Sequence, residues 1–502
     1  MATQEEMTDA PPEYETMCEA YGRIANLGHA ASVLNWDQEV MMPEGGTPAR
    51  SQQLSTLSGL RHELLVDGEL GPALESLDAD ALDDERSAAV REVRHEYDRQ
   101  TSVPRELVEE ISATTSEALP KWKQAREEDD FSVFAPVLEE LVELKREYAA
   151  HIDEERDPYE VLFEEYEPYL GIDTAERVLD RLGDALPPLI EDIRASDAEL
   201  ADPFADGAFD TDAQEAVSRD ILDALGYDWD RGRLDTAPHP FSTGNVYDAR
   251  VTTRFDESDP LGAITSTVHE FGHALYTLGL PEEEYAAPLG GSRDLTVHES
   301  QSRFWENHVA RTRSFWATFA PALNERFGTD ATPREVYEAA NTVDTSNLIR
   351  VEADELTYHM HIVLRFEIER DLIRGDLDVA DVPAAWNEKC EEYLGVRPET
   401  DREGCLQDIH WSHGSFGYFP TYTLGSVLAA QLDAAVRSDL DVDGLVADGE
   451  FGPVREWLRE HVHRHGSRYT TDELIENATG EAYTADYFLD YVRSKYGSLY
   501  DL

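Results

Sequence analysis

Two histidines and a glutamate stand at a spacing that could hold a metal ion and use it. His269 and His273 are four residues apart, so on a helix they share a face, with Glu270 beside them. This His-Glu-x-x-His pattern is typical of zinc peptidases: two neutral imidazoles bind the metal, and the carboxylate takes a proton from the water that the metal activates. The alternative is a pair of buried, satisfied histidines that match a short motif by chance.

The residues around this motif predict one helix over 260–279. Asp259 can cap it, Pro260 suits its first turn and Gly279 suits its end. Glu270 is the only charged residue in the segment, although 29% of the chain is charged. Apolar residues recur at steps of three and four and form one stripe: Leu261, Ile264, Val268, Phe271, Leu275 and Leu278. We therefore expect a helix enclosed on most sides, where a bound cation offsets the cost of burying the motif.

A zinc ion held by two histidines of one helix needs a third protein ligand and an open position. The metzincin pattern would place a third histidine six residues after His273, but Gly279 stands there and excludes that class. A carboxylate from a following helix, which begins near Thr296, is the remaining option. Glu299 is our choice, and Glu306 on the same helix is its rival; either could instead be one of the many surface acids of this chain.

A later arginine could bind the end of a peptide. The sequence predicts a helix over about 347–374, in which Arg350 and Asp354 are spaced to interact along one face. An arginine fork held by a carboxylate suits the terminal carboxylate of a peptide. A surface salt bridge is the alternative interpretation.

The segment 404–422 is rich in Gly, His and Tyr and poor in the acid found elsewhere. A cleft lined with polar groups would have this composition, and His410, Tyr418 and Tyr422 are candidate donors to a developing oxyanion. An aromatic core loop is the alternative.

The elements that must position these residues are mainly helical. From about Glu13 to Leu200 the pattern predicts helices throughout, with breaks at Pro43 to Gly46, Val103–Pro104 and Pro203 to Asp212. These helices carry no obvious catalytic set, and we expect them to form walls and a lid over a groove. A loop over 238–245 then precedes a strand over 246–255, which could pair with an extended peptide or be a plain edge strand.

The amino-acid composition limits the classes of partner that the chain can bind. The 502 residues carry a formal charge of −64, from 106 acidic and 42 basic side chains, so nucleic acid and anionic membranes are repelled. A hydrophobic content of 41%, with eight Trp and 22 Tyr, argues against a disordered acidic chain. Acid spread over the whole chain, with Arg in place of Lys, is typical of a halophilic archaeon, and we expect folding to need high salt.

Three cysteines, Cys18, Cys390 and Cys405, are an odd count in a long chain, which predicts a reducing compartment and no disulfide framework. The first 12 residues lack the apolar segment of a secretory signal, and no run of about 18 apolar residues could span a membrane. We expect a cytoplasmic protein.

Taken together and in order, several motifs resemble the carboxypeptidase Taq family, the thermostable metallocarboxypeptidases of the gluzincin group. The matching stretches are His239–Phe241, Asp248–Thr252, His269–His273, His298–Gln301, Ile349–Asp354 and Gly404–Trp411. Leu34–Gln38 and Met42–Pro43 are also similar, so the likeness covers essentially the whole chain.

The resemblance implies a mainly α, groove-containing metallopeptidase fold with a small β-sheet beside the metal helix, and a homodimer. We expect a single domain over 1–502, with a helical N-terminal lobe over about 1–235 and a metal-site half over about 236–502. The implied activity is removal of single residues from peptide C-termini with broad preference, generally stopping at proline. Zinc or cobalt, one divalent ion per chain, is the implied cofactor.

For the site we expect His269, His273 and Glu299 to bind the metal, and Glu270 to take a proton from water and deliver it to the leaving amine. A donor from His410, Tyr418 or Tyr422 would stabilise the oxyanion.

Arg350 would bind the substrate's free carboxylate, and Arg250 or His239 could share that role. Two other functions stay open at this point. An endo-acting metallo-oligopeptidase of related helical fold would share the metal site but lack the clamp, the arginine (here Arg350) that binds the terminal carboxylate. A catalytically inactive helical protein that binds peptides would not need to keep Glu270.

Overall fold

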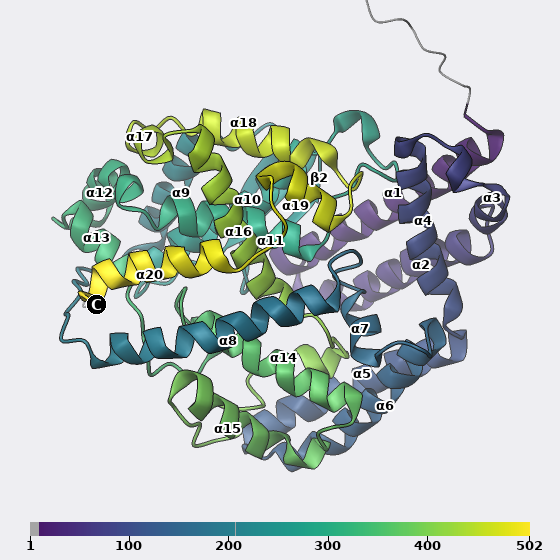
Figure 1. Cartoon of the computed structure of the whole chain (residues 1–502), viewed down its shortest axis with the longest axis horizontal. Coiled ribbons are helices and arrows are strands. Elements are labelled where there is room, and N and C mark those ends of the chain that lie inside the picture. The colour runs from purple at the N-terminus through teal and green to yellow at the C-terminus, as the bar shows by residue number, and fades with distance from the viewer. Residues whose placement is uncertain (1–9, 206) are drawn as a thin grey trace, which may run out of the picture.

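Helices make up most of the chain, which confirms the predicted fold class (Figure 1). The computed structural model describes residues 10–205 and 207–502. The helices that precede the sheet are α1 (Pro12–Val40), α2 (Thr47–Val66), α3 (Leu70–Ser76), α4 (Asp84–Ser102), α5 (Arg105–Glu128), α6 (Ala135–Ile152), α7 (Pro158–Phe163), α8 (Ile172–Ala195) and α9 (Thr211–Leu225). The predicted breaks fall between α1 and α2, between α4 and α5, and between α8 and α9. Proline and glycine therefore located these boundaries correctly.

A small sheet lies between α9 and the helix that carries the His-Glu-x-x-His motif. Its strands β1 (Gly232–Thr236), β2 (Ser242–Asn245) and β3 (Asp248–Thr253) are ordered β1-β3-β2, with β1 parallel and β2 antiparallel to β3. The predicted strand is therefore the central one, and both of its edges are already paired. Pairing of a peptide with this strand is ruled out, and so is its being an edge strand.

The predicted loop before that strand contains β2. Gly244 makes the turn to β3 possible because its φ is 140°, and a Cβ atom there would lie 1.8 Å from the Asp248 carbonyl oxygen. The turn brings β2 back beside β3, with Thr243 opposite Arg250. Local composition predicted the loop but not this pairing.

The motif helix is α10 (Pro260–Gly279), with the bounds that the sequence predicts. The Asp259 side chain caps it by accepting a hydrogen bond from the Gly262 amide at 2.8 Å. Most of its side chains are buried, including Glu270, so the prediction of an enclosed helix is confirmed. The helix packs on β3, on α9 and on α11 (Leu295–Arg303), which continues as a π-helical segment, η5 (Phe304–Ala310).

The remaining helices are α12 (Arg313–Phe327), α13 (Pro333–Ala340), α14 (Tyr358–Arg374), α15 (Val382–Leu394), α16 (Pro420–Asp439), α17 (Val442–Ala447), α18 (Gly452–His461), α19 (Thr471–Thr479) and α20 (Asp486–Tyr500). The predicted helix over 347–374 is wrong in its first part, because α14 begins at Tyr358. The Asp354 carboxylate accepts hydrogen bonds from the Leu356 and Thr357 amides at 2.9 Å and so starts the helix. Arg350 lies upstream in a single 3₁₀ turn, η6 (Arg350–Glu352).

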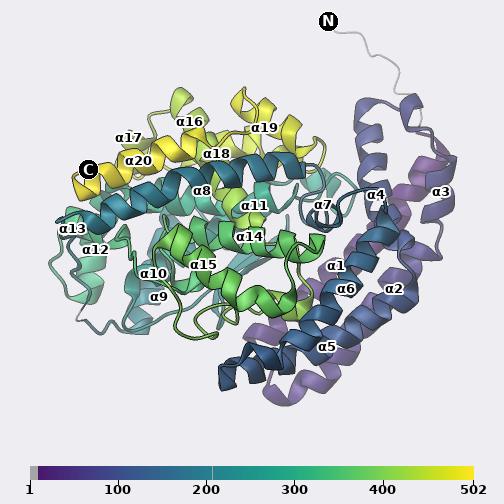
Figure 2. The ribbon, with the colours of Figure 1, turned by 60° about the horizontal axis from the view of Figure 1, so that its bottom comes forward.

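Two hydrophobic cores are prominent. The larger one runs from Ala118 to Tyr500 and includes the buried face of α10, whereas a smaller one joins α1, α2, α3 and α4 with Leu289. Figure 2 shows α1, α2 and α3 at one side of the molecule, away from α20. The predicted division near residue 235 stays a prediction.

Cys18, Cys390 and Cys405 are free thiols, as the odd count predicts. Within the described residues, none of the helices is both long enough and apolar enough to cross a membrane.

Two glycines allow α11 to lie against its neighbours. A Cβ atom at Gly272 of α10 would lie 2.5 Å from the Gln301 carbonyl oxygen, and one at Gly425 of α16 would lie 2.4 Å from Glu299 Cβ. Because these distances are far below a van der Waals contact, any side chain at either position would separate the helices.

We expect Gly272→Ala to lower the thermal unfolding midpoint, through a loss of about 1–3 kcal/mol of unfolding free energy from overpacking. Gly59→Ala in α2 is the matched control, since that glycine has open space around its Cβ position. Its helix should gain about 0.5–1 kcal/mol. Differential scanning calorimetry of both variants checks this, and equal midpoints would contradict the close packing of α10 and α11.

Candidate metal centre

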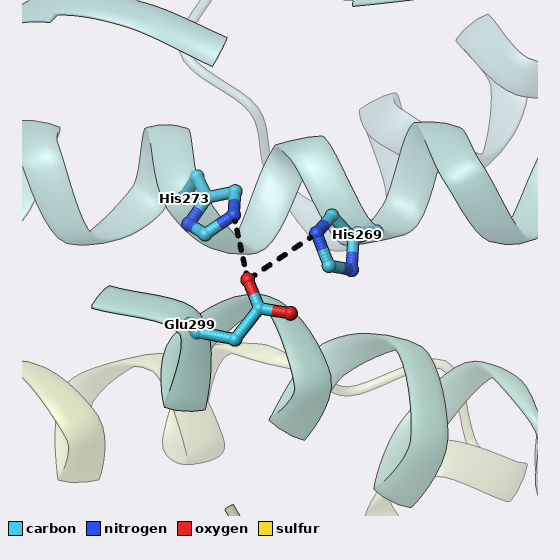
Figure 3. A group of neighbouring side chains, drawn as sticks. All are labelled: His269, His273 and Glu299. Carbon is cyan, nitrogen blue, oxygen red and sulfur yellow. Dashed lines mark ion pairs between the residues drawn. The ribbon is translucent and has the colours of Figure 1, made fainter. Parts of the chain in front are cut away.

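His269 and His273 of α10 and Glu299 of α11 point toward one another (Figure 3). Their ligand atoms all lie within 4.8 Å of each other. Glu299 Oε2 is 3.7 Å from His269 Nε2 and 3.4 Å from His273 Nε2. Ligands bound tetrahedrally at about 2.0–2.2 Å from a zinc ion are separated by about 3–4 Å, so this donor set fits a divalent ion.

The outer nitrogens of both imidazoles have their own partners. His269 Nδ1 lies 2.9 Å from Glu306 Oε2, and His273 Nδ1 lies 2.6 Å from His298 Nδ1. Burial and the neighbouring His273 lower the pKa of His298 to about 3, so His298 is neutral near pH 7 and can accept this hydrogen bond. A proton on Nδ1 of each imidazole, directed at Glu306 and His298, would leave both Nε2 atoms free to bind a metal.

Glu306, the rival third ligand, orients His269 instead of facing the gap between the ligands. Arg303 links it to Glu299: Arg303 Nε donates to Glu299 Oε1 at 2.7 Å, and Nη1 donates to Glu306 Oε2 at 2.9 Å. Burial alone would raise the pKa of Glu299, but Arg303 and the histidines hold it below its usual range. Glu299 thus presents an ionised carboxylate to the histidines.

His298 and Arg303 were not among the predicted site residues. Both could have been found from spacing. His298 directly precedes the expected ligand, and Arg303 follows it by one helical turn. The orienting role of such neighbours is general at metal sites.

Glu270 lies on α10 between the two histidines and is 6% exposed. Its Oε2 atom is buried and makes no hydrogen bond to any residue that the structure describes. Burial raises the pKa of this carboxyl, although the neighbouring histidines oppose the rise. A carboxylate with a free oxygen and a raised pKa is suited to accept a proton.

A cavity of about 490 Å³ opens beside His269. Its lining includes His269, Arg303, Glu306, Arg350, Tyr358 and Ser426. Arg350 therefore shares a cavity with a candidate metal ligand.

The predicted pairing of Arg350 with Asp354 is wrong. Arg350 Nε and Nη2 donate to Asp408 Oδ1 at 3.0 and 2.8 Å, and Nη1 donates to the Tyr358 hydroxyl at 3.2 Å. Asp354 is engaged at the start of α14, so it is not available to the arginine. The segment 404–411 instead holds this turn, since Gln407 also accepts a hydrogen bond from the Arg350 amide at 2.9 Å.

His410, Tyr418 and Tyr422 form one aromatic cluster near Arg350. The ring centroids of His410 and Tyr418 are 5.6 Å apart, and those of Tyr418 and Tyr422 are 5.2 Å apart. Tyr422 contacts Tyr358. Among the described residues, Tyr358 lines the cavity, whereas His410, Tyr418 and Tyr422 do not. Burial lowers the pKa of His410 to about 4, so its imidazole is neutral near pH 7. Which of the three predicted donors acts on an oxyanion stays a prediction.

His239 and Arg250 lie on the sheet side of α10. His239 is exposed in the loop between β1 and β2. Arg250 pairs with Asp248, with its Nη2 at 2.6 Å from Oδ2, and its guanidinium lies 4.2 Å from the centroid of Trp36. Neither is among the described residues that line the Arg350 cavity, so the structure does not bring them to the predicted clamp. A role for them in substrate binding stays a prediction.

Comparison with known proteins gives consistent results. A family model described as carboxypeptidase Taq (M32) metallopeptidase matches residues 16–496. The chain is 40% identical over 483 residues to thermostable carboxypeptidase 1 of Pyrococcus furiosus, which covers 95% of this chain and 97% of that protein. It is 38% identical over 504 residues to thermostable carboxypeptidase 1 of Thermus thermophilus, with 97% and 99% covered. The crystal structure of the M32 carboxypeptidase from Deinococcus radiodurans matches with a TM-score of 0.93 at 38% identity, covering 98% of this chain and 100% of that one.

The amount of metal that two variants bind distinguishes Glu299, the expected ligand, from Glu306, the expected orienting partner of His269. We expect Glu299→Ala to lose the bound ion, because a carboxylate ligand is removed. Glu306→Gln should keep one ion per chain but bind it about 10- to 100-fold more weakly, the usual cost of losing an orienting partner. Equilibrium dialysis against zinc, followed by elemental analysis, measures both. Full occupancy in the Glu299→Ala variant, with loss in Glu306→Gln, would exchange the two roles.

Proposed function

Because the chain belongs to the carboxypeptidase Taq (M32) metallopeptidase family and is a metallocarboxypeptidase, we propose that His269, His273 and Glu299 hold its divalent ion. The observation that supports this assignment is the convergence of two Nε2 atoms and one carboxylate within 4.8 Å on two tightly packed helices. Glu306 and His298 lie within hydrogen-bond distance of the two Nδ1 atoms, which supports the tautomer that a metal requires.

Two imidazoles and one carboxylate are the ligand set of a catalytic zinc site with one open position. Zinc is therefore the proposed metal, with cobalt as the alternative. When bound, the ion polarises the scissile carbonyl and lowers the pKa of water at the open position.

Glu270 is the proposed general base. Its free oxygen takes the proton of the attacking water and later delivers it to the nitrogen of the leaving amino acid. The buried environment that raises its pKa favours the first transfer, because it makes the carboxylate a stronger base than an exposed one. A donor from His410, Tyr418 or Tyr422 is proposed to stabilise the tetrahedral oxyanion.

Arg350 is the proposed binding group for the substrate's free carboxylate. It lines the same cavity as His269, and its guanidinium is held by Asp408, so it is already oriented when the peptide arrives. Binding the carboxylate at this point sets which peptide bond reaches the metal, and only the last residue is released.

The negative charge and the free thiols support proposals about the source of the protein, its partners and its location. A charge of −64 supports an origin in a halophilic archaeon and a requirement for salt, which screens repulsion between surface acids. The negative charge also favours peptides as partners, because it repels nucleic acid and anionic membranes. Free thiols support a cytoplasmic location. The family resemblance supports a homodimer.

Glu270→Gln tests the base directly. We expect turnover of an unblocked peptide to fall by at least about 10²- to 10⁴-fold, because the amide cannot accept the proton. The metal content should stay at the wild-type level, since Glu270 is not one of the three proposed ligands. Mass spectrometry of the released amino acid and elemental analysis give the two readings; appreciable residual turnover would remove Glu270 as the base.

Arg350→Ala tests the clamp. We expect the KM of an N-blocked tripeptide with a free C-terminus to rise by a factor on the order of 30 or more, the loss of about 2 kcal/mol or more for truncating a buried charged hydrogen-bond partner. The inhibition constant of the same tripeptide as its C-terminal amide should change little, because the amide carries no charge. Parallel changes in both constants would contradict the proposed carboxylate contact.

A further inference from the structure

A second arginine lies behind the proposed carboxylate clamp. Arg365 of α14 is fully buried, with 0% exposure. Its Nε donates to Asp408 Oδ2 at 2.6 Å, its Nη2 lies 2.6 Å from the same oxygen, and its Nη1 donates to the His361 carbonyl at 2.7 Å. Its guanidinium also lies 4.6 Å from the centroid of the Trp386 ring. A cation buried so completely is costly unless it neutralises a charge.

The carboxylate of Asp408 is divided between two arginines. Oδ1 accepts both hydrogen bonds from Arg350, and Oδ2 faces Arg365. One negative charge therefore serves two guanidiniums, both of which stay protonated because arginine does not lose its proton in proteins. The trio Arg350–Asp408–Arg365 carries a net charge of +1.

The titratable groups that lie against the buried side of the trio do not cancel this charge. His410 Nδ1 lies 3.9 Å from Asp408 Oδ1, and burial keeps both His410 and His361 neutral by lowering their pKa values. Glu369, one turn from Arg365 on α14, is buried and accepts hydrogen bonds from Trp411 and the Gly417 amide. Burial raises the pKa of Glu369 to about 8, so this carboxyl is mostly protonated near pH 7.

The only opening of the trio toward the cavity, among the described residues, is at Arg350. If Arg350 were the single arginine partner of Asp408, Asp408 would neutralise the charge of Arg350. A peptide carboxylate would then meet an ion pair with no net charge. With Arg365 on its second oxygen, Asp408 orients Arg350 without cancelling it. A free peptide carboxylate then completes two pairs of opposite charge.

We propose that Arg365 is a positioning residue for substrate recognition: by sharing Asp408, it leaves Arg350 with the uncompensated charge that selects a free C-terminal carboxylate. This inference rests on the proposed role of Arg350. It differs from a purely structural role, in which Arg365 ties the segment around Asp408 to α14 and its charge is irrelevant to the substrate.

The test uses the full-length, metal-loaded protein and two constants that do not depend on the fraction of active enzyme. One is the KM of an N-blocked tripeptide with a free C-terminus, and the other is the inhibition constant of its C-terminal amide. For Arg365→Met we expect KM to rise on the order of 10-fold, the effect of one unit charge about 12 Å from the substrate carboxylate at an effective dielectric constant of about 20. The kcat and the inhibition constant of the amide should be retained.

Conservative and control variants separate charge from packing. Arg365→Lys keeps the charge and should keep KM near the wild-type value. Arg365→Gln keeps an N–H donor for Asp408 without the charge, and it replaces the Met variant if that protein does not fold. Arg146→Met is the matched control, because Arg146 also supports α14, through hydrogen bonds to the carbonyls of Leu372 and Ile373. Its KM should not change.

An unchanged KM in the neutral variants would overturn the inference. Equal increases for Arg365→Lys and Arg365→Met, or a parallel rise in the inhibition constant of the amide, would assign Arg365 a structural role and overturn it as well. Arg350→Ala distinguishes the two levels of failure. If that variant loses affinity for the free acid and the Arg365 variants do not, only the present inference fails; if Arg350→Ala itself has no effect, the proposed clamp fails with it.

Discussion

Two imidazoles and one carboxylate face one another in a buried space, and the rest of the site follows from that constraint. Glu299 Oε2 lies 3.7 Å from His269 Nε2 and 3.4 Å from His273 Nε2, and the ligand atoms of all three side chains lie within 4.8 Å of one another. Their far sides are satisfied by Glu306, His298 and Arg303, so the groups cannot turn away without breaking those bonds. A divalent cation bound between them would be held by all three groups. Close packing of α10 on α11 at Gly272 keeps the three groups within reach of one ion.

Arginine is used differently at the two ends of the site, in a chain that has few basic residues. Near the proposed metal site, Arg303 lies between Glu299 and Glu306 and keeps both carboxylates ionised. Glu299 is a proposed ligand, and Glu306 is the partner of the proposed ligand His269. At the clamp, one carboxylate, Asp408, lies between two arginines and leaves positive charge in excess. The first arrangement favours a cation and the second an anion. In the proposed function, a peptide would satisfy both, with the carbonyl of its last peptide bond at the metal and its terminal carboxylate at Arg350.

Local spacing predicted the features that depend on local structure. The bounds of α10 and its cap at Asp259 follow from helical periodicity, and the structure agrees with them. Glu299 lies in one group with His269 and His273, whereas its choice over Glu306 as the third ligand stays a prediction. The partner of Arg350 was predicted wrongly because Asp408 lies 58 residues further along the chain, and spacing carries no information about such a contact. The same reason explains the sheet: β3 is central because β1 and β2 fold back beside it from outside the predicted strand.

The position of the ion tests the account most directly. Diffraction data from crystals of the zinc-loaded protein, recorded on both sides of the zinc absorption edge, locate the metal without assumptions about its ligands. The account predicts one anomalous peak per chain, about 2.0–2.2 Å from Nε2 of His269, Nε2 of His273 and a carboxylate oxygen of Glu299. A peak bound by Glu306 in place of Glu299, or the absence of a peak between α10 and α11, would contradict it.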